Sequence, residues 1–475
     1  MVRRMQPTSL TGYSALIDAP LAGSVVLFPE PARVAEAARL PVGPVWAGPF
    51  LGLLLSIAIF PVVAPRFWER RMGWVSLFWI LCLLAPLAAV QGFLPALSAA
   101  WHAMLVEYLP FVTLLVALFT VGGGILVRGG PGGTPAGNTA LLAIGIVLAG
   151  LMGTTGAAMV LIHPLLRSNA HRSRKVHLAV FFIVLVANAG GATTPLGDPP
   201  LYIGFLRGVP FPWPLLHLTP VLGFFAGLLL AAFYLLDRFV AAADPPRPKP
   251  ERFHVRGWRN IGLLAMTVTA VFAQAIWPPT MVNILGQEMG AERLAGSILF
   301  LAITGASWLI TPNAVRQGNM FAWHPIQEVA ILFAGIFVTI GPVLSMLQQG
   351  LEGAAAPVLR LTLDEAGRGD PVAFFWLSGV LSAFLDNAPT YLVFFQLAGG
   401  DVARLSNGLS RELEAIAAGS VFFGGLTYIG NAPNLMVRAI AAHRGVHMPG
   451  FFGYMVWSCA LMLPALALIT LLFFV

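Results

Sequence analysis

The sequence predicts an all-α polytopic membrane protein with an inverted structural repeat, two re-entrant hairpins and two broken transmembrane helices. Of its 475 residues, 58% are hydrophobic and only 10% are charged, whereas soluble domains carry about a quarter charged residues. Apolar stretches of roughly 20 residues recur along the chain, each long enough to cross the hydrocarbon core of a bilayer. Apolar segments interrupted by Gly and Pro occupy matching positions in the two halves, a pattern typical of transporters.

Twelve apolar segments organise the chain. They are continuous rather than alternating, which excludes a transmembrane β-barrel. A Pro-rich basic linker at 241–258 separates a first membrane repeat (43–240) from a second, inverted one (259–475), and an irregular extension outside the membrane (1–42) precedes both. The segments lie near 43–65, 74–92, 103–127, 138–166, 176–206, 214–237, 259–277, 294–311, 326–348, 371–397, 412–443 and 450–475.

The basic residues predict which side of the membrane each loop occupies. Suppose that 138–166 and 371–397 are hairpins that leave the membrane on the face by which they entered. Then 17 of the 27 Lys and Arg residues fall on the side of the 241–258 linker and ten on the other. The positive-inside rule predicts a multi-pass protein of the inner (cytoplasmic) membrane, with a cytoplasmic linker and an outside N-terminus. The same threading gives the two halves opposite polarity.

The net charge of +7 does not indicate nucleic-acid binding, because the basic residues occupy short loops between apolar runs, as membrane topology requires. Cys82 and Cys459 both lie inside apolar runs, so neither a disulfide framework nor a metal cluster is predicted. We expect no cofactor and no nucleic-acid partner. The expected partners are the lipid bilayer and small ions.

The first chemically unusual stretch is NAGGATTPLGDPP at 188–200, which directly follows an apolar run. A helix broken inside hydrocarbon leaves backbone groups that lipid cannot satisfy, and such backbone is tolerated only where it is buried in protein or lines a polar cavity. Carbonyls and a carboxylate suit a small cation, whereas half-helix N-termini suit an anion. A kinked helix whose polar groups bond to neighbours is the structural alternative. The candidate ligands are Thr193, Thr194 and Asp198, beside the helix-breaking Gly197.

A second break occupies the matching position of the other half, at Thr427, Gly430, Asn431, Pro433 and Asn434. Asp198 and Asn431 are 233 positions apart (431 − 198), and downstream RGVPF is echoed by RGVHMPGF. Two features that repeat at nearly one offset indicate an internal duplication. Paired interrupted segments of this kind are the best sequence indication of a transporter binding site.

The tips of the predicted hairpins are the other candidate elements. They read GTTGAA at 153–158 and LDNAPT at 385–390, and aligning Thr155 with Asp386 gives an offset of 231 (386 − 155). Gly and Pro permit the sharp reversal. The candidate binding residues at the tips are Thr154, Thr155, Asp386, Asn387 and Thr390.

An ionisable residue inside a transmembrane segment indicates function by default. Burial disfavours the charged form of a carboxyl group and a bound cation favours it, so one carboxylate can exchange H⁺ for Na⁺. Asp386 and Asp198 are therefore the proton-carrier candidates. The alternative for Asp386 is a hairpin cap that accepts hydrogen bonds from backbone N–H groups, and both roles can hold together.

These segments resemble the ion-transporter superfamily, specifically the NhaD-type sodium/proton antiporters and the neighbouring citrate-transporter group. The resemblance spans about residues 49 to 475, and its most specific elements are GDPP and LDNAPT. It is carried by Pro49–Arg71, Ala187–Pro200, Glu328–Phe337, Ser382–Thr390 and Thr427–Asn434.

The resemblance implies a mobile transport part, a dimerising scaffold and hence a homodimer. It also implies ion binding around Asn188 and Thr194, near Thr427, and Na⁺ at Asp198, Asp386, Asn387 and Asn431. Carboxylate-transporting relatives typically carry Ser-Asn-Thr-like motifs at the hairpin tips. This chain has TTG and LDNAPT instead, which favours cation exchange.

The leading hypothesis is a secondary active transporter, a Na⁺/H⁺ antiporter that works by alternating access and is not an enzyme. The alternative is a Na⁺- or H⁺-coupled carrier of citrate or a related carboxylate or oxyanion. A third hypothesis from another class is an intramembrane aspartyl protease that uses Asp198 and Asp386. It would require the two carboxyl groups to share one proton at close range.

Overall fold

The computed structural model describes residues 43–475 except 131, 243–250 and 279. The predicted extension 1–42 therefore lies outside the described residues. Each of the twelve predicted apolar segments contains at least one helix. Nine helical stretches in the described part of the chain are long and apolar enough to cross a membrane, which confirms the predicted helical polytopic class.

The first half of the chain ends with a long helix, α10. In order it contains η2 (Pro44–Ala47), α2 (Gly48–Val63), α3 (Pro65–Gln91), α4 (Phe93–His102), the π-helical η3 (Ala103–Tyr108), α5 (Leu109–Gly123), β1 (Leu126–Gly130), α6 (Pro135–Met152), α7 (Thr154–Ser168), α8 (Val176–Leu185), the 3₁₀ turn η4 (Ala189–Thr193), α9 (Pro199–Leu206) and α10 (Trp213–Ala241).

The second half begins with a strand and ends with the C-terminal helices. It contains β2 (Glu251–Arg256), α11 (Arg259–Ala275), β3 (Met281–Ile284), β4 (Gln287–Gly290), α12 (Ala291–Ile310), α13 (Asn313–Gly318), α14 (His324–Gln348), η5 (Gly350–Glu352), α15 (Ala356–Arg360), α16 (Pro371–Phe384), α17 (Asn387–Leu397), η6 (Arg404–Gly408), α18 (Ser410–Phe422), η7 (Phe423–Leu426), α19 (Ala432–His443), α20 (Phe451–Ile469) and η8 (Thr470–Phe474).

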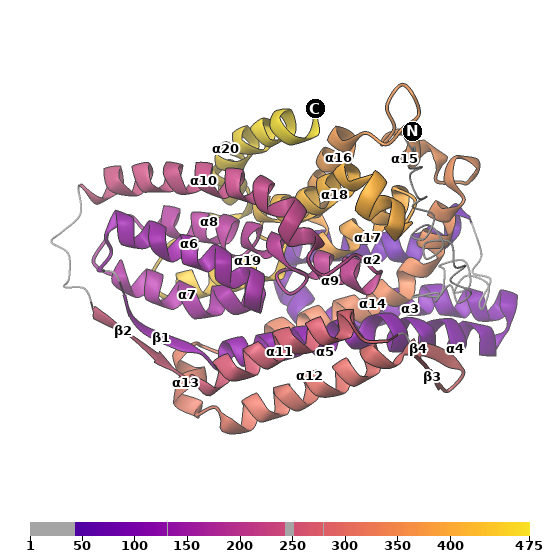
Figure 1. The fold of residues 1–475 in the computed structure, drawn as a ribbon, viewed down its shortest axis with the longest axis horizontal. Helices are drawn as coiled ribbons and strands as arrows, with labels where there is room; N and C mark the ends of the chain where they lie inside the picture. The colour runs from indigo at the N-terminus through magenta and orange to yellow at the C-terminus, as the bar shows by residue number, and fades with distance from the viewer. Residues whose placement is uncertain (1–42, 131, 243–250, 279) are drawn as a thin grey trace, which may run out of the picture.

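Most of the helices run roughly along the long axis of the molecule (Figure 1). In this view α5, α11 and α12 lie along one edge and α10 and α20 along the opposite edge. The pair α6–α7 lies toward one end of the long axis, and the pair α16–α17 lies toward the other. The interrupted segments α8–α9 and α18–α19 lie between the two edges, so they are surrounded by other helices.

The end of the predicted linker forms a β-strand, which the sequence analysis did not predict. Its residues 251–256 form β2, which pairs antiparallel with β1, with Val127 opposite Val255 and Arg128 opposite His254. The pairing satisfies backbone hydrogen-bonding groups of two segments that lie far apart in the chain. The start of the second half is thereby attached to the segment between α5 and α6.

A buried ion pair joins the ends of several helices in the first half. The carboxylate of Asp237 in α10 accepts hydrogen bonds from Arg172, from His177 Nε2 at 2.8 Å and from Asn138 Nδ2 at 2.9 Å. Arg172 also donates to the Gly133 carbonyl at 2.6 Å. The side chains of Arg172 and Asp237 are both fully buried, so each charge depends on the other.

We expect Asp237→Ala to destabilise the protein by about 3–5 kcal/mol, because it removes the buried carboxylate that accepts hydrogen bonds from Arg172, His177 and Asn138. Thermal unfolding in detergent would measure the loss. The control is Asp364→Ala, which removes the partner of Arg368 in an exposed ion pair and should leave the melting temperature nearly unchanged. Equal effects of the two substitutions would contradict this account.

Candidate functional site

The first break in a helix falls between α8 and α9. The chain leaves α8 at Leu185, makes the 3₁₀ turn η4 and re-enters a helix at Pro199. Proline is favoured at the first helical position, where its missing N–H costs no hydrogen bond. Asp198 is the N-cap residue of α9, so its carboxylate stands at the positive end of a helix dipole.

The second break, between α18 and α19, has the same construction. A 3₁₀ turn (η7) follows Phe422, the chain is extended at Thr427, and α19 begins after its N-cap residue Asn431. The backbone angles φ and ψ are −148° and 146° at Asp198 and −155° and 139° at Asn431. Residues 233 positions apart therefore have nearly the same backbone conformation.

Hydrogen bonds repeat at this spacing too. The hydroxyl of Thr194 donates to the carbonyl of Gly150, and the hydroxyl of Thr427 donates to the carbonyl of Ala383 at 2.5 Å. Both the donors (427 − 194) and the acceptors (383 − 150) are 233 positions apart. These two threonines thus hold each break against the helix that precedes the neighbouring hairpin tip.

The hairpin tips follow the same spacing, which corrects the alignment expected from the sequence. The tip residue between α6 and α7 is Gly153, with φ 79° and ψ 149°, and the one before α17 is Asp386, with φ 76° and ψ 144°. The structure therefore pairs Asp386 with Gly153 (386 − 153 = 233) rather than with Thr155. The offset of 231 was wrong because local sequence similarity does not reveal which residue takes the positive φ.

Asp386 carries a backbone conformation that favours glycine. A non-glycine residue in this region costs on the order of 1–3 kcal/mol and persists only where the surroundings enforce it. Its Oδ1 accepts a hydrogen bond from the Ala388 N–H at 3.2 Å, so the predicted capping role is present. A glycine would adopt this backbone conformation with less strain.

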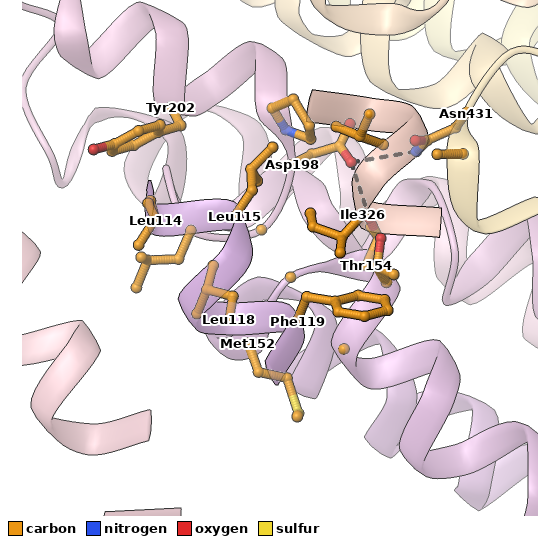
Figure 2. Close-up of a pocket in the computed structure, with 18 of the residues that line it drawn as sticks. Leu114, Leu115, Leu118, Phe119, Met152, Thr154, Asp198, Tyr202, Ile326 and Asn431 are labelled. Carbon is orange, nitrogen blue, oxygen red and sulfur yellow. Dashed lines mark hydrogen bonds between the residues drawn. The ribbon is translucent and has the colours of Figure 1, made fainter. Parts of the chain in front are cut away.

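Asp198 is the centre of a buried polar cluster (Figure 2). Its Oδ1 accepts hydrogen bonds from the Thr154 hydroxyl at 3.0 Å and from Asn431 Nδ2 at 3.3 Å, and its Oδ2 accepts one from Asn387 Nδ2. All four side chains are at most 3% exposed. Thr154 and Asn387 are 233 positions apart, as are Asp198 and Asn431, so two equivalent pairs meet around one carboxylate.

A pocket of about 60 Å³ opens onto this cluster, with room for a few water molecules. Thr154, Thr155, Gly197, Asp198, Asp386 and Asn431 all line it. The rest of its wall is largely apolar and includes Leu114, Leu118, Phe119, Met152 and Ile326 (Figure 2). None of the described residues that line the pocket is Lys, Arg or His. The two carboxylates therefore share one cavity that holds no positive side chain.

Several predicted site residues have structural roles behind the pocket. Thr194 and Thr427 support the breaks as described, and the Thr390 hydroxyl donates to the Asp386 carbonyl at 2.8 Å. Thr193 packs against α6, where its Oγ1 lies beside Gly150. Gly430 makes a close approach, because a Cβ added there would lie 2.7 Å from the Gly424 carbonyl oxygen. None of these five residues lines the pocket.

Asn188 lies one layer deeper and is held by Asn434, which the sequence analysis placed in the second break but not among the binding residues. Its Nδ2 donates to the Ile183 carbonyl and to Asn434 Oδ1, both at 2.8 Å. Asn434 in turn donates to the carbonyls of Gly424 and Thr427, at 2.8 and 2.9 Å, and so joins the two breaks. Its signal was its place three residues after Asn431 in the NAPN sequence of the second break.

Two amide oxygens of the site accept no hydrogen bond from a described residue, Asn188 Oδ1 and Asn387 Oδ1. Buried polar atoms are nearly always paired, so unpaired ones call for an explanation. The oxygen of Asn387 belongs to the side chain that donates to Asp198. It is thus an unused oxygen ligand beside a carboxylate.

A family model described as "Putative citrate transport" matches residues 39–474. The chain belongs to this family. The Na⁺/H⁺ antiporter NhaD of Vibrio parahaemolyticus is 27% identical to it over 356 residues, covering 69% of this chain and 78% of the relative. The resemblance to the ion-transporter superfamily is thus confirmed, and the nine apolar helical stretches in the described part of the chain are those of a multi-pass membrane protein.

Two mycobacterial relatives are also similar. An uncharacterised transporter of Mycobacterium tuberculosis is 25% identical over 275 residues, and a 46 kDa membrane protein of Mycobacterium leprae is 25% identical over 276 residues. Each match covers 55% of this chain and 59% of the relative. The matched region thus spans less than two thirds of these relatives. The family description and the names of the Vibrio and Mycobacterium tuberculosis relatives refer to transport, which argues against the protease hypothesis.

We expect Gly191→Ala to disrupt the cluster, because the added Cβ would lie 2.8 Å from both Asp198 Cβ and Thr154 Cγ2. Such overpacking costs about 1–3 kcal/mol and shifts the neighbouring atoms. Transport in proteoliposomes should fall sharply while the protein still folds. Gly223→Ala is the matched control, since nothing lies within 4 Å of its added Cβ. Full transport by the Gly191 variant would show that this cluster is not the transport site.

Proposed function

We propose that the protein is a Na⁺/H⁺ antiporter that exchanges the two cations at the cluster around Asp198 and Asp386 by alternating access. The observation that carries the proposal is the charge of the pocket: two carboxylates line it, and none of its described lining residues is a cation. Carboxylate and amide oxygens are the ligands that hard cations prefer in proteins. The named activity of the Vibrio relative agrees with this proposal.

The same side chains can serve both bound states. In the present geometry Thr154, Asn387 and Asn431 donate hydrogen bonds to Asp198. A half-turn of the Asn387 amide would replace its NH₂ group with Oδ1, which has no partner among the described residues. The cluster would then present oxygens to a cation instead of N–H groups to the carboxylate. Proton and Na⁺ thereby compete for one site, and that competition couples their movements.

Alternating access agrees with the repeated framework. The tips, the breaks and their threonine hydrogen bonds recur 233 residues apart, and α6–α7 and α16–α17 lie toward opposite ends of the molecule (Figure 1). We infer an inverted repeat whose two re-entrant hairpins reach the site from opposite membrane faces. The positive-inside distribution supports the orientation that we propose, with the 241–258 linker in the cytoplasm, the N-terminus outside and the protein in the inner membrane. By the resemblance it acts as a homodimer.

The second candidate function is a carrier of citrate or a related carboxylate, which the description of the family favours. A polyanion entering this pocket would meet two carboxylates and no described cationic side chain. It would need bound cations, together with the N-termini of α9 and α19, to offset its charge. Uptake of labelled citrate by proteoliposomes, without Na⁺ exchange against a pH gradient, would establish this alternative.

Asp198→Asn should reduce Na⁺ flux driven by an imposed pH gradient to background, because it removes the central negative charge and keeps the size of the side chain. Flux in proteoliposomes, measured with ²²Na⁺, checks this. Asp364→Asn, in an exposed loop far from the pocket, is the control and should transport normally. Undiminished flux in the Asp198 variant would exclude the proposed exchange site.

Asp386 allows its charge to be tested apart from its capping role. Asparagine caps helices as well as aspartate does, so Asp386→Asn keeps the cap and should still abolish exchange. Asp386→Gly fits the positive φ and should unfold at an equal or higher temperature, yet transport nothing. If the asparagine variant transports normally, Asp386 is only a cap and the proton must be carried elsewhere.

Competition between H⁺ and Na⁺ predicts a definite pH dependence. Lowering the pH on the Na⁺-binding side protonates the carboxylates and should raise the apparent KM for Na⁺, by up to about tenfold per pH unit where protonation dominates. The maximal rate at saturating Na⁺ should change much less. Initial rates over a Na⁺ series at several pH values provide the measurement. An apparent KM that does not vary with pH would show that the two ions bind independently.

A further inference from the structure

A second cavity lies on the outer surface of the first two long helices, away from the polar cluster. It is a groove of about 310 Å³ between α2 and α3. Six of the eight lining residues are apolar and five of those are aromatic; the lining consists of Ser56, Phe60, Phe67, Arg71, Trp74, Val75, Phe78 and Trp79. We call these residues the α2–α3 groove.

The groove has a fixed floor. The indole Nε1 of Trp79 donates to the Ser56 hydroxyl at 3.0 Å, and that hydroxyl donates to the Gly52 carbonyl at 2.7 Å. A Cβ at Gly52 would lie 2.2 Å from the Trp79 ring, so glycine is what allows the ring to lie against α2. The walls remain open, because Trp74 is 66% exposed and Phe78 is 56% exposed.

Among the described residues, Arg71 is the only charged one that lines the groove, and it stands near the end where α2 meets α3. None of the ion pairs formed within the described chain involves Arg71. Two further exposed arginines, Arg66 and Arg70, stand on the same end of α3, with one carboxylate, Glu69, beside them. This end of the groove therefore carries a net positive charge, while its length is apolar.

The dimensions match one leaflet of a bilayer. Arg71 and Trp79 are eight residues apart on α3, or about 12 Å at 1.5 Å per residue. Half of the hydrocarbon core measures about 15 Å. A guanidinium at headgroup level thus leaves the aromatic side chains at the depth of acyl chains. In the orientation proposed above this is the cytoplasmic leaflet, where anionic lipids attract basic residues.

We propose that the α2–α3 groove binds one anionic phospholipid, with an acyl chain against its aromatic side chains and the phosphate beside Arg71. The aromatic walls supply apolar contact, and the uncompensated arginine selects the charge of the headgroup. A second copy of this chain would have to bring a carboxylate to Arg71 to bind equally well. The site does not depend on which ion the protein transports.

The test uses the delipidated full-length protein in detergent. Phosphatidylglycerol and phosphatidylcholine with the same brominated acyl chains are titrated separately. Because the chain has twelve tryptophans, the part of the fluorescence quenching that Trp74→Phe removes reports lipid in the groove. We expect saturable quenching at one phosphatidylglycerol per chain, with weaker binding of phosphatidylcholine. Arg71→Gln should weaken phosphatidylglycerol binding about fivefold, the contribution of one basic residue at a membrane surface.

Arg70→Gln is the matched control, since Arg70 is the preceding residue, equally charged and exposed, and lies outside the groove. It should leave the affinity for phosphatidylglycerol unchanged within twofold. Trp74→Ala should weaken the binding of both lipids, because it removes an exposed wall of the groove and spares the fold. Melting temperatures of all variants verify that each is folded.

Three results would overturn the proposal. Equal losses in the Arg70 and Arg71 variants would mean attraction by diffuse surface charge. Equal affinities for the two lipids would mean an unselective lipid layer. Absence of saturable quenching, with crosslinking between copies through Phe78→Cys, would mean that a second chain covers the groove. The lipid affinity is measured without any transport assay. Failure of this proposal can therefore be distinguished from failure of the proposed antiport.

Discussion

The structure depends on one constraint: backbone groups freed by breaking a helix inside hydrocarbon must find partners within the protein. Both breaks meet it with the same devices. A threonine hydroxyl donates to a carbonyl of the neighbouring helix and, at Thr427, also accepts from the N–H groups of Ile429 and Gly430. Asn434 satisfies two more carbonyls. Because these partners lie on neighbouring helices and hairpins, satisfying the backbone also fixes where the tips stand.

The framework is repeated, but its charges are not. Asp198 corresponds to Asn431, and Asp386 corresponds to Gly153, with nearly equal backbone angles in each pair. At each of these two positions, an uncharged residue in one half adopts the same backbone conformation as the aspartate in the other half. At Gly153 it does so with less strain than Asp386. The backbone conformation at these positions therefore does not need a carboxylate, which is why we propose that both carboxylates serve the bound ion, with Asp386 also capping α17.

The sequence was sufficient for the features that depend on local chemistry. Long apolar runs, Gly and Pro at the breaks and the recurrence of GDPP-like and LDNAPT-like segments predicted the helices and both interruptions. The family resemblance, rather than local chemistry, implied that Asp198 and Asp386 belong to one site. Contacts between segments that are distant in the chain could not be predicted from the sequence. Nothing local distinguishes Asp237 as the partner of Arg172, 65 positions away, or predicts that β2 pairs with β1. Which threonine oxygen faces the pocket is also decided by packing, so Thr154 meets Asp198 whereas Thr194 turns to Gly150.

The charge of the pocket bears on the disagreement between the family description and the named activity of the Vibrio relative. Moving a carboxylate substrate into a site of low dielectric requires positive charge nearby, since burying an unpaired anion is costly. Here the fixed charges are negative, and the groups around Asp198 are a hydroxyl and two amides. A cation lowers the electrostatic energy of such a site and a polyanion raises it. The side-chain charges of the pocket therefore support our proposal of cation exchange, and citrate would need a bound cation or the N-termini of α9 and α19 to offset its charge.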